Sequence, residues 1–383
     1  MIQKEWDESK IADQIQIRAI RQRRPLSCML ELTYSCNFRC KMCYIRMSDA
    51  QASHFGRMRT LEEWLDMARQ LRDAGVLYLT LTGGECTQYP GFVKLYEQLA
   101  RMGFRISILS NAGAYNDSIR DVFRCYPPYS ASITLYGGSN ETYAAVTGDP
   151  RGLDKVLENI RFLKSVGIPV ALNFTMIRQN ALDYPQIGEL CRELGLSYTM
   201  ITDITRHRYD PSFSDAFACR LAPAERACVA CHPPGEVAEA LKNAMELEKD
   251  LETFRLPAAP TEPIRMIQDA CVGASTGCAI SWNGDMQTCI SMLGYHDAKP
   301  FEIGFEAAWL QLKAEQDETF RRPDACQICS MEKDCLHNCA GRRAEGVGSP
   351  HKPDPYVCQY VYLLKLYKVR QNRADISRPP ECI

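Results

Sequence analysis

Between residues 27 and 203, short strand-like segments and longer amphipathic segments follow one another in a regular order. Short apolar runs predict strands at 27–33, 76–81, 105–110, 130–135, 170–177 and 197–202. Amphipathic stretches between them predict helices at 60–74, 91–102, 118–124, 153–166 and 185–194. Thr60 and Glu63 form a capping-box pattern at the start of the first helix, and Gly75 follows its end. Strand and helix therefore alternate about six times, which indicates a parallel sheet covered by helices.

Six strand–helix units are too few for a closed eight-unit barrel. The fold class is therefore α/β, and the periodicity leaves a partial (β/α)6 parallel barrel and a doubly wound sheet open as alternatives.

After residue 203 the pattern breaks. Seven prolines interrupt residues 204–268, with one helix predicted at 237–254, and we interpret this stretch as a bridge between domains. We divide the chain into an N-terminal helical segment (1–26), a core (27–203), the bridge (204–268), a cysteine-rich C-terminal domain (269–360) and a tail (361–383). A further helix is predicted at 356–370.

The composition indicates a soluble globular protein of 383 residues, with 46% hydrophobic and 24% charged residues. The net charge of −2 argues against binding to nucleic acid or to a membrane surface. No stretch approaches the ~18 apolar residues of a membrane span, and the polar N-terminus lacks the apolar core of a signal peptide. We therefore expect a cytoplasmic protein. The basic cluster Arg18, Arg21, Arg23 and Arg24 is either a solvated helix face or an anchor for an acidic peptide or protein.

The 19 cysteines change this picture, because in a reducing compartment cysteines more often bind metal or carry chemistry than form disulfides. Cys36, Cys40 and Cys43 form C-x3-C-x2-C in the loop after the first predicted strand. This is the edge of a parallel sheet where α/β proteins place their chemistry. Three thiolates can hold three irons of a four-iron cluster and leave the fourth iron open to a ligand. Zinc binding is the alternative.

Two motifs together resemble the radical S-adenosylmethionine (SAM) superfamily. Residues 33–44 are similar to its cluster-binding loop, and Gly83-Gly84-Glu85 at the end of the second strand is similar to its Gly-Gly-Glu motif. The resemblance implies a [4Fe-4S] cluster on the three cysteines and a methionine amino group held at the Gly-Gly-Glu motif. Glycines permit a close backbone approach, and a carboxylate accepts charge-assisted hydrogen bonds from an ammonium.

Polar residues at the next strand ends extend this resemblance. Ser110 and Asn111 correspond to residues that contact the ribose or the methionine carboxylate, and Thr134 to a residue near the ribose. Capping of the strand ends is the alternative role for these three residues. Cys86 stands where a proline often follows the glutamate, and we interpret it as a free buried cysteine.

A second array of cysteines lies in the C-terminal domain. It consists of Cys271, Cys289, Cys326, Cys329, Cys335, Cys339 and Cys358, and it resembles the SPASM domain of peptide- and protein-modifying radical enzymes. The resemblance implies two auxiliary [4Fe-4S] clusters with interleaved ligands, one on Cys326, Cys329, Cys335 and Cys358. The other would use Cys271, Cys289 and Cys339, with Cys278 as the nearest candidate for a fourth ligand unless that iron is open to substrate.

Four further residues, Cys219, Cys228, Cys231 and His232, lie outside this series. They could form another metal site, supply the missing ligand, or be thiols at the surface or beside the substrate.

The resemblance implies reductive cleavage of SAM to a 5′-deoxyadenosyl radical that abstracts hydrogen from a substrate. We expect a ribosomally made peptide that is modified oxidatively, through a thioether or carbon–carbon cross-link. The alternatives are oxidation of a protein residue as in anaerobic sulfatase maturases, and a small-molecule enzyme of cofactor biosynthesis. Ile290 stands where those maturases carry an aspartate, which weakens the first alternative. A non-enzymatic electron carrier is a fourth possibility, but it needs no methionine-binding motif.

This hypothesis requires several partners and a residue that accepts a proton. We expect a peptide or protein substrate and an electron donor such as flavodoxin or ferredoxin. Only about 26 residues precede the first strand, which is too short for a leader-binding domain. A separate protein could supply one, or the basic segment or the 204–268 bridge could recognise the substrate without it. Asp285, Tyr136 and Cys86 are candidate proton acceptors near the site.

Overall fold

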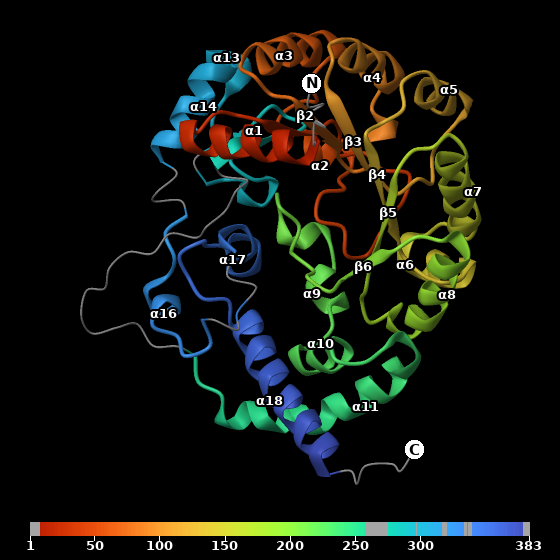
Figure 1. Cartoon of the computed structure of the whole chain (residues 1–383), viewed down its shortest axis with the longest axis vertical. Coiled ribbons are helices and arrows are strands. Elements are labelled where there is room, and N and C mark those ends of the chain that lie inside the picture. Colours follow the sequence, from red (N-terminus) through yellow and green to blue (C-terminus); the bar gives the residue numbers. More distant parts are fainter. Residues whose placement is uncertain are drawn as a thin grey trace, which may run out of the picture.

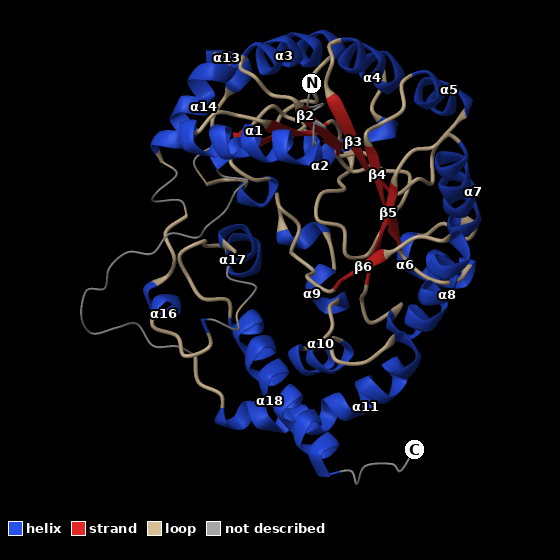
Figure 2. Cartoon of the chain, in the orientation of Figure 1, coloured by secondary structure: helices blue, strands red, loops and turns tan. Residues whose placement is uncertain are grey.

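The computed structural model describes residues 8–256, 275–295, 297–315, 320–332, 335 and 339–377. Its centre is an eight-stranded sheet with the order β6-β5-β4-β3-β2-β1-β7-β8 (Figure 2). The first six strands are parallel and follow one another in chain order. They are β1 (Ser27–Glu31), β2 (Tyr78–Thr82), β3 (Arg105–Ser110), β4 (Ser130–Leu135), β5 (Val170–Thr175) and β6 (Tyr198–Ile201). A doubly wound sheet would reverse its order at a switch point, so the structure confirms the partial (β/α)6 barrel.

Helices follow the strands along the outer side of the sheet (Figure 1). They are α3 (Leu61–Asp73), α4 (Phe92–Arg101), α5 (Asp117–Cys125), α7 (Gly152–Ser165) and α8 (Tyr184–Leu194). The predicted capping box forms at Thr60, whose side chain accepts a hydrogen bond from the backbone N–H of Glu63. The short helices α2 (Asp49–Ala52) and α6 (Asn140–Thr147) were not predicted, and α1 (Glu8–Gln22) precedes the sheet.

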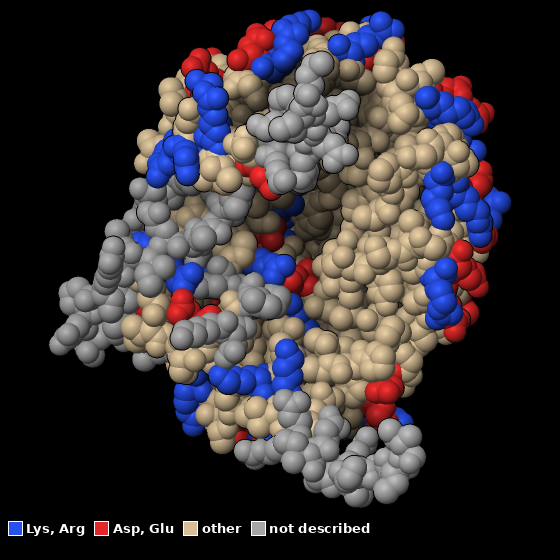
Figure 3. All heavy atoms as spheres, viewed as in Figure 1, with Lys and Arg blue, Asp and Glu red and all other residues tan. Residues whose placement is uncertain are grey.

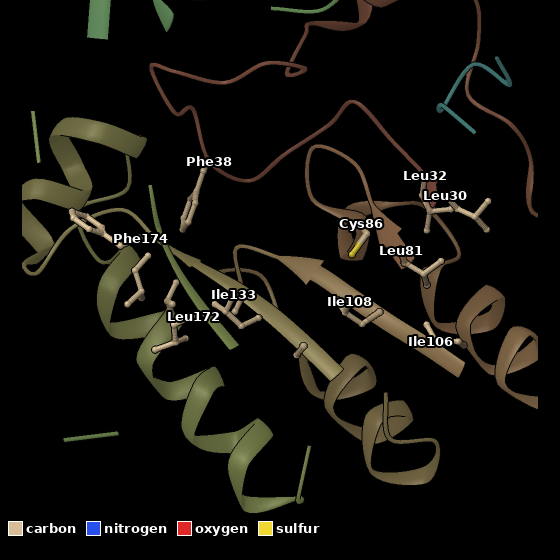
Figure 4. Close-up of a cluster of buried hydrophobic side chains, with 14 of the residues drawn as sticks. Leu30, Leu32, Phe38, Leu81, Cys86, Ile106, Ile108, Ile133, Leu172 and Phe174 are labelled. Atoms are coloured by element: carbon tan, nitrogen blue, oxygen red, sulfur yellow. The ribbon is translucent and has the colours of Figure 1, made fainter. Parts of the chain in front are cut away.

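The apolar positions of the central strands form the core between sheet and helices. Leu30, Leu81, Ile108 and Ile133 are each at most 1% exposed. Figure 4 shows these side chains in a row from strand to strand, with Phe38 reaching toward them from the loop after β1. Burial of this kind contributes about 25 cal/mol for each Å² of apolar surface removed from water. Because Phe38 is packed into this core, the loop that carries it is held against the sheet.

Two strands of the predicted C-terminal domain extend the core sheet. β7 (Gly277–Ile280) pairs in parallel with β1, and β8 (Met286–Gln287) pairs antiparallel with β7. The proposed boundary at residue 269 did not anticipate this connection. Parallel partners far apart in the sequence leave no local signal, because each strand is specified only by its own short apolar run.

The bridge and the C-terminal region form a helical part beside the open end of the barrel (Figure 1). Its helices are α9 (Ala216–Cys219), α10 (Pro223–Val229), α11 (Val237–Glu248), α16 (Asp324–Gln327), α17 (Ala340–Val347) and α18 (Pro355–Ser377). The helices α13 (Pro300–Ile303) and α14 (Phe305–Ala314) lie instead beside α3 in the outer layer (Figure 1). The helix predicted at 237–254 is split into α11 and the 3-10 turn η5 (Lys249–Thr253), and α18 is longer than predicted. No helix among the described residues combines the length and the apolar character needed to cross a bilayer.

Candidate active site

The loop that carries Cys36, Cys40 and Cys43 lies directly on the end of β2. The backbone N–H of Gly84 donates to the carbonyl of Thr33 at 2.6 Å, and that of Glu85 donates to the carbonyl of Ser35 at 2.9 Å. The cysteine loop and the Gly83-Gly84-Glu85 turn therefore form one connected structure.

The two glycines of this turn are required by that close contact. A Cβ atom on Gly83 would lie 2.6 Å from the Thr33 oxygen, and one on Gly84 would lie 2.3 Å from the Ser35 oxygen. Gly83 also has a φ of 152°, which side chains rarely adopt. The sequence predicted that the glycines let the backbone approach a ligand. The structure adds that the backbone of the two glycines lies against the backbone of the cysteine loop.

A cavity of about 290 Å³ opens at the carboxyl edge of the sheet. Its wall brings together eight of the residues predicted from sequence: Cys36, Cys40, Cys43, Gly83, Gly84, Ser110, Asn111 and Thr134. The ends of β1 to β4 supply these residues, because the carboxyl ends of parallel strands meet at one edge. Figure 3 shows the molecule hollowed in its centre, with basic and acidic side chains within the hollow.

Donor groups surround the sulfur atoms of the loop. The backbone N–H groups of Phe38 and Arg46 donate to Cys36 Sγ at 3.4 Å and to Cys43 Sγ at 3.2 Å, respectively. The Asn111 amide nitrogen lies 3.4 Å from Cys36 Sγ. Such donors favour a thiolate over a thiol. Burial opposes them and, together with the negative charge of Glu85, raises the pKa of Cys36 to about 12. Because burial favours the neutral thiol, a positively charged group such as iron is needed to stabilise these cysteines as thiolates.

These residues fit a [4Fe-4S] cluster, which Cys36, Cys40 and Cys43 would hold. Among the described residues, no group of three His, Cys, Asp or Glu side chains is arranged to hold a single metal ion. A [4Fe-4S] cluster requires a different arrangement of ligands from a single ion. Each thiolate binds a separate iron, so the sulfur atoms need not converge on one point.

The Glu85 carboxylate has partners within the protein. It is 1% exposed and accepts hydrogen bonds from the hydroxyls of Thr87 (2.7 Å) and Ser110 (2.8 Å) and from the backbone N–H of Asn111 (2.8 Å). It thereby joins the end of β2 to the end of β3 behind the cavity wall. Burial raises its pKa, while these donors oppose the rise. The sequence predicted a contact with a methionine ammonium and did not predict this structural role.

We expect Glu85→Ala to destabilise the protein, because it leaves the donors of Thr87, Ser110 and Asn111 buried without an acceptor. Each such group costs about 1–3 kcal/mol. Thermal unfolding should show a clear fall in Tm, whereas Glu97→Ala, on the exposed face of α4, should leave Tm nearly unchanged. An unchanged Tm in Glu85→Ala would show that the three donors find other partners.

The three candidate proton acceptors lie in different surroundings. Tyr136 lines the cavity. Cys86 is fully buried, with Sγ 3.6 Å from the carbonyl of Leu109, and burial raises its pKa well above the usual value. Asp285, in the turn between β7 and β8, forms an ion pair with Lys299, which directly precedes α13. Of the three, Tyr136 is the one placed to act in the cavity.

The opposite wall of the cavity contains polar residues that sequence reasoning missed. Asn173 and Thr175 lie on β5, and Asp203 and Thr205 follow β6. The signal that identified Ser110 and Thr134, a polar residue at the end of a strand, was present here as well. Asp203 also forms ion pairs with Arg226 and Arg342, which connect the cavity wall to α10 and α17.

The C-terminal cysteines gather in two places. Burial raises the pKa of the Cys358 thiol to about 12, and the nearby thiols of Cys326, Cys335 and Cys329 add to this rise. Cys289 and Cys339 each precede the first residue of a helix, η6 (Ile290–Met292) and α17, and these two helices pack together. Cys271 lies outside the described residues.

Cys278 is placed elsewhere. It is buried on β7 opposite Cys28 of β1, and the two sulfur atoms are 3.5 Å apart. This position packs Cys278 between the two strands, and its role as a fourth ligand stays a prediction.

The separate series around α10 does not form one group. Cys219 packs beside Met42 in a small apolar cluster, whereas Cys228, Cys231 and His232 face α18. His232 Nε2 lies 3.3 Å from the Tyr367 hydroxyl, and its Nδ1 lies 2.7 Å from the carbonyl of Cys228. These contacts give the residues a packing role between the two helices.

The fold and the site agree with a comparison to protein families. Residues 30–204 match the model of the Radical SAM superfamily. This segment runs from β1 to the end of the six-stranded barrel and contains the cysteine loop and the Gly-Gly-Glu turn. It is a radical SAM domain.

Curated relatives match the same part of the chain. The sporulation killing factor maturation protein SkfB of Bacillus subtilis is 27% identical over 171 residues, which are 45% of this chain and 40% of SkfB. A probable GTP 3′,8-cyclase of Saccharolobus islandicus is 28% identical over 176 residues, 45% of this chain and 56% of that protein. The antilisterial bacteriocin subtilosin biosynthesis protein AlbA of Bacillus subtilis is 23% identical over 188 residues, 48% of this chain and 41% of AlbA. The matches thus span about half the length of these relatives.

Solved structures resemble nearly the whole chain. SuiB of Streptococcus suis bound to the precursor peptide SuiA superposes with a TM-score of 0.61 at 16% identity, over 94% of this chain and 83% of SuiB. The protein anSMEcpe with bound AdoMet gives a TM-score of 0.62 at 15% identity, over 92% of this chain and all of that chain. At these identities the similarity shows a shared fold.

Proposed function

We propose that this protein is a radical SAM enzyme that modifies a ribosomally made peptide oxidatively. The observation that carries the proposal is the single cavity in which Cys36, Cys40 and Cys43 meet the polar ends of β2 to β4. A cluster bound there, when reduced, would supply the electron that cleaves SAM to a 5′-deoxyadenosyl radical.

The residues around the cavity bind the cluster, orient SAM and shield the radical from water. The three cysteines hold the cluster, and Gly83, Gly84, Glu85, Ser110, Asn111 and Thr134 are the proposed contacts of SAM. The apolar side chains of Phe38, Met42 and Ile45 line the same cavity and exclude water from a reactive radical. We propose that Tyr136 donates a hydrogen bond from its hydroxyl into the cavity, because burial raises its pKa and keeps the phenol protonated.

The C-terminal cysteines are proposed to hold two auxiliary [4Fe-4S] clusters in a SPASM domain at residues 269–360. Cys326, Cys329, Cys335 and Cys358 would bind one. Cys271, Cys289 and Cys339 would bind the other, with Cys278 as the candidate fourth ligand unless that iron is open to substrate. The proximity of the first four thiols and the packing of η6 on α17 support these sets. Such clusters suit oxidative chemistry because they accept the electron left after hydrogen abstraction.

The class of substrate rests on the relatives. SkfB and AlbA are named for the maturation or biosynthesis of a killing factor and a bacteriocin, and SuiB was solved with a precursor peptide. We therefore propose a peptide substrate, a thioether or carbon–carbon cross-link as product, and a flavodoxin or ferredoxin as electron donor. A separate protein could bind the leader of the peptide. The similarity to GTP 3′,8-cyclases keeps a small-molecule substrate as the second candidate.

The test offers both substrates to the same reconstituted enzyme. Short peptides encoded beside the gene, cysteine-rich ones first, and GTP are incubated separately with enzyme, SAM and dithionite under anaerobic conditions. A peptide that loses the mass of two hydrogen atoms, with 5′-deoxyadenosine formed in proportion, is the expected result. Conversion of GTP with every peptide unchanged would contradict the peptide proposal and favour the second candidate.

A further inference from the structure

Arg208, in the bridge after β6, lies between the cysteine loop and α17. Its guanidinium forms an ion pair with Glu31 at the end of β1 (2.7 Å) and a longer one with Glu345 on α17 (3.5 Å). The guanidinium also lies 4.1 Å from the centre of the Tyr44 ring. The backbone N–H of Arg208 donates to the carbonyl of Tyr44 at 2.9 Å. One side chain therefore contacts the strand before the cysteine loop, the loop itself and a helix of the C-terminal region.

The contacts are buried, which strengthens them. The side chain of Arg208 is 7% exposed, that of Glu31 is fully buried and that of Glu345 is 11% exposed. Charges interact more strongly where water is excluded, and a buried charge that loses its partner is strongly destabilising. A second contact reinforces the connection, because Arg206 donates to the carbonyl of Gly346 on α17 at 2.6 Å.

The two ends of this connection are the two regions assigned to iron–sulfur clusters. Tyr44 directly follows Cys43, and α17 begins directly after Cys339. A guanidinium presents several N–H groups in a rigid plane and can meet two carboxylates at once, which the single ammonium of a lysine does less well.

We propose that Arg208 is a positioning residue that holds the cysteine loop against α17. A loss of conformational order in one of the two candidate cluster regions then lowers the conformational order of the other. The clusters at each end rest on the proposed function. The mechanical connection rests on the contacts of Arg208, reinforced by Arg206, and can be tested whether or not iron is bound.

The test is hydrogen–deuterium exchange of the full-length protein, read in peptides that cover residues 42–47 and 340–347. Glu345→Gln weakens only the α17 end and keeps the buried pair of Arg208 with Glu31. Arg208→Lys keeps the positive charge but loses the planar fork, so Glu31 is not left without a partner. The matched control is Arg120→Gln, which removes an ion pair between α5 and α7 on the outer layer.

In both test variants we expect exchange to rise about tenfold in both segments, and not in Arg120→Gln. A rise confined to residues 340–347 in Glu345→Gln, with residues 42–47 at the wild-type rate, would overturn the coupling. The iron content and 5′-deoxyadenosine yield of the wild type, measured on the same preparation, separate the two proposals. A wild type without iron or product would contradict the proposed function, while the exchange result would still decide the role of Arg208.

Discussion

Replacing Cys36, Cys40 and Cys43 together with alanine is expected to abolish formation of 5′-deoxyadenosine from SAM and to lower bound iron from about 12 to about 8 atoms per chain. The loss follows because these are the cysteines that line the cavity, so no thiolate there could hold iron. The C-terminal cysteines are untouched and should keep their irons. The measurement is anaerobic reconstitution with iron and sulfide, followed by iron counting and chromatography of the SAM products.

The control for this variant is Cys125→Ala, which removes an exposed thiol at the end of α5 and should leave both values unchanged. Several outcomes would contradict the assignment. Twelve or so irons in the triple variant would place the cluster elsewhere. A wild type that binds zinc, or that carries about four irons or none and forms no product, would refute the three-cluster proposal.

Gly84→Ala is expected to have the second largest effect, although it adds one methyl group. That methyl would lie 2.3 Å from the carbonyl oxygen of Ser35 and 2.7 Å from that of Tyr34. Both are backbone atoms, so the cysteine loop as a whole must move away from β2. Overpacking of this kind costs about 1–3 kcal/mol in stability. We also expect the yield of 5′-deoxyadenosine to fall at least about tenfold, because small displacements of reacting groups lower rates steeply.

Gly235→Ala provides the comparison, since a Cβ at Gly235 meets no atom within 4 Å. Tm and product yield should stay at wild-type values in this variant. If Gly84→Ala kept full iron content and product yield, the loop would be able to shift without loss, and the contact between loop and turn would not be needed for activity.

The strands and helices of the barrel could be predicted from the chain with little error. The predicted bounds of β3 and β4, residues 105–110 and 130–135, are those observed. In both strands buried apolar residues are interspersed with polar ones, which is a pattern carried by neighbouring residues and therefore local. By contrast, α14 and α17 lie in the cysteine-rich region, where no clear period was read and no helix was predicted. Their packing against distant partners decides their structure more than propensity does.

The candidate site was largely predictable for the same reason. Cysteines at short spacing and polar residues at strand ends are local features, and the parallel order of the strands brings their carboxyl ends to one edge. The sequence alone therefore determined the alternation of parallel strands and helices, the cysteine loop and eight residues of the cavity wall. The strand order of the folded sheet decided between the partial barrel and a doubly wound sheet. The sequence could not place Cys278, because spacing does not reveal that β7 pairs with β1 and buries this thiol beside Cys28.

Tertiary structure decided the contacts between segments far apart in the chain. It turned the Glu85 carboxylate toward Ser110 and Asn111, pressed the glycine turn against the cysteine loop, and placed Arg208 between Glu31 and Glu345. Each of these contacts joins residues whose separation in sequence carries no period or motif. A local pattern determines which element forms, whereas the partner of a buried charge or a close backbone contact depends on how the whole chain packs.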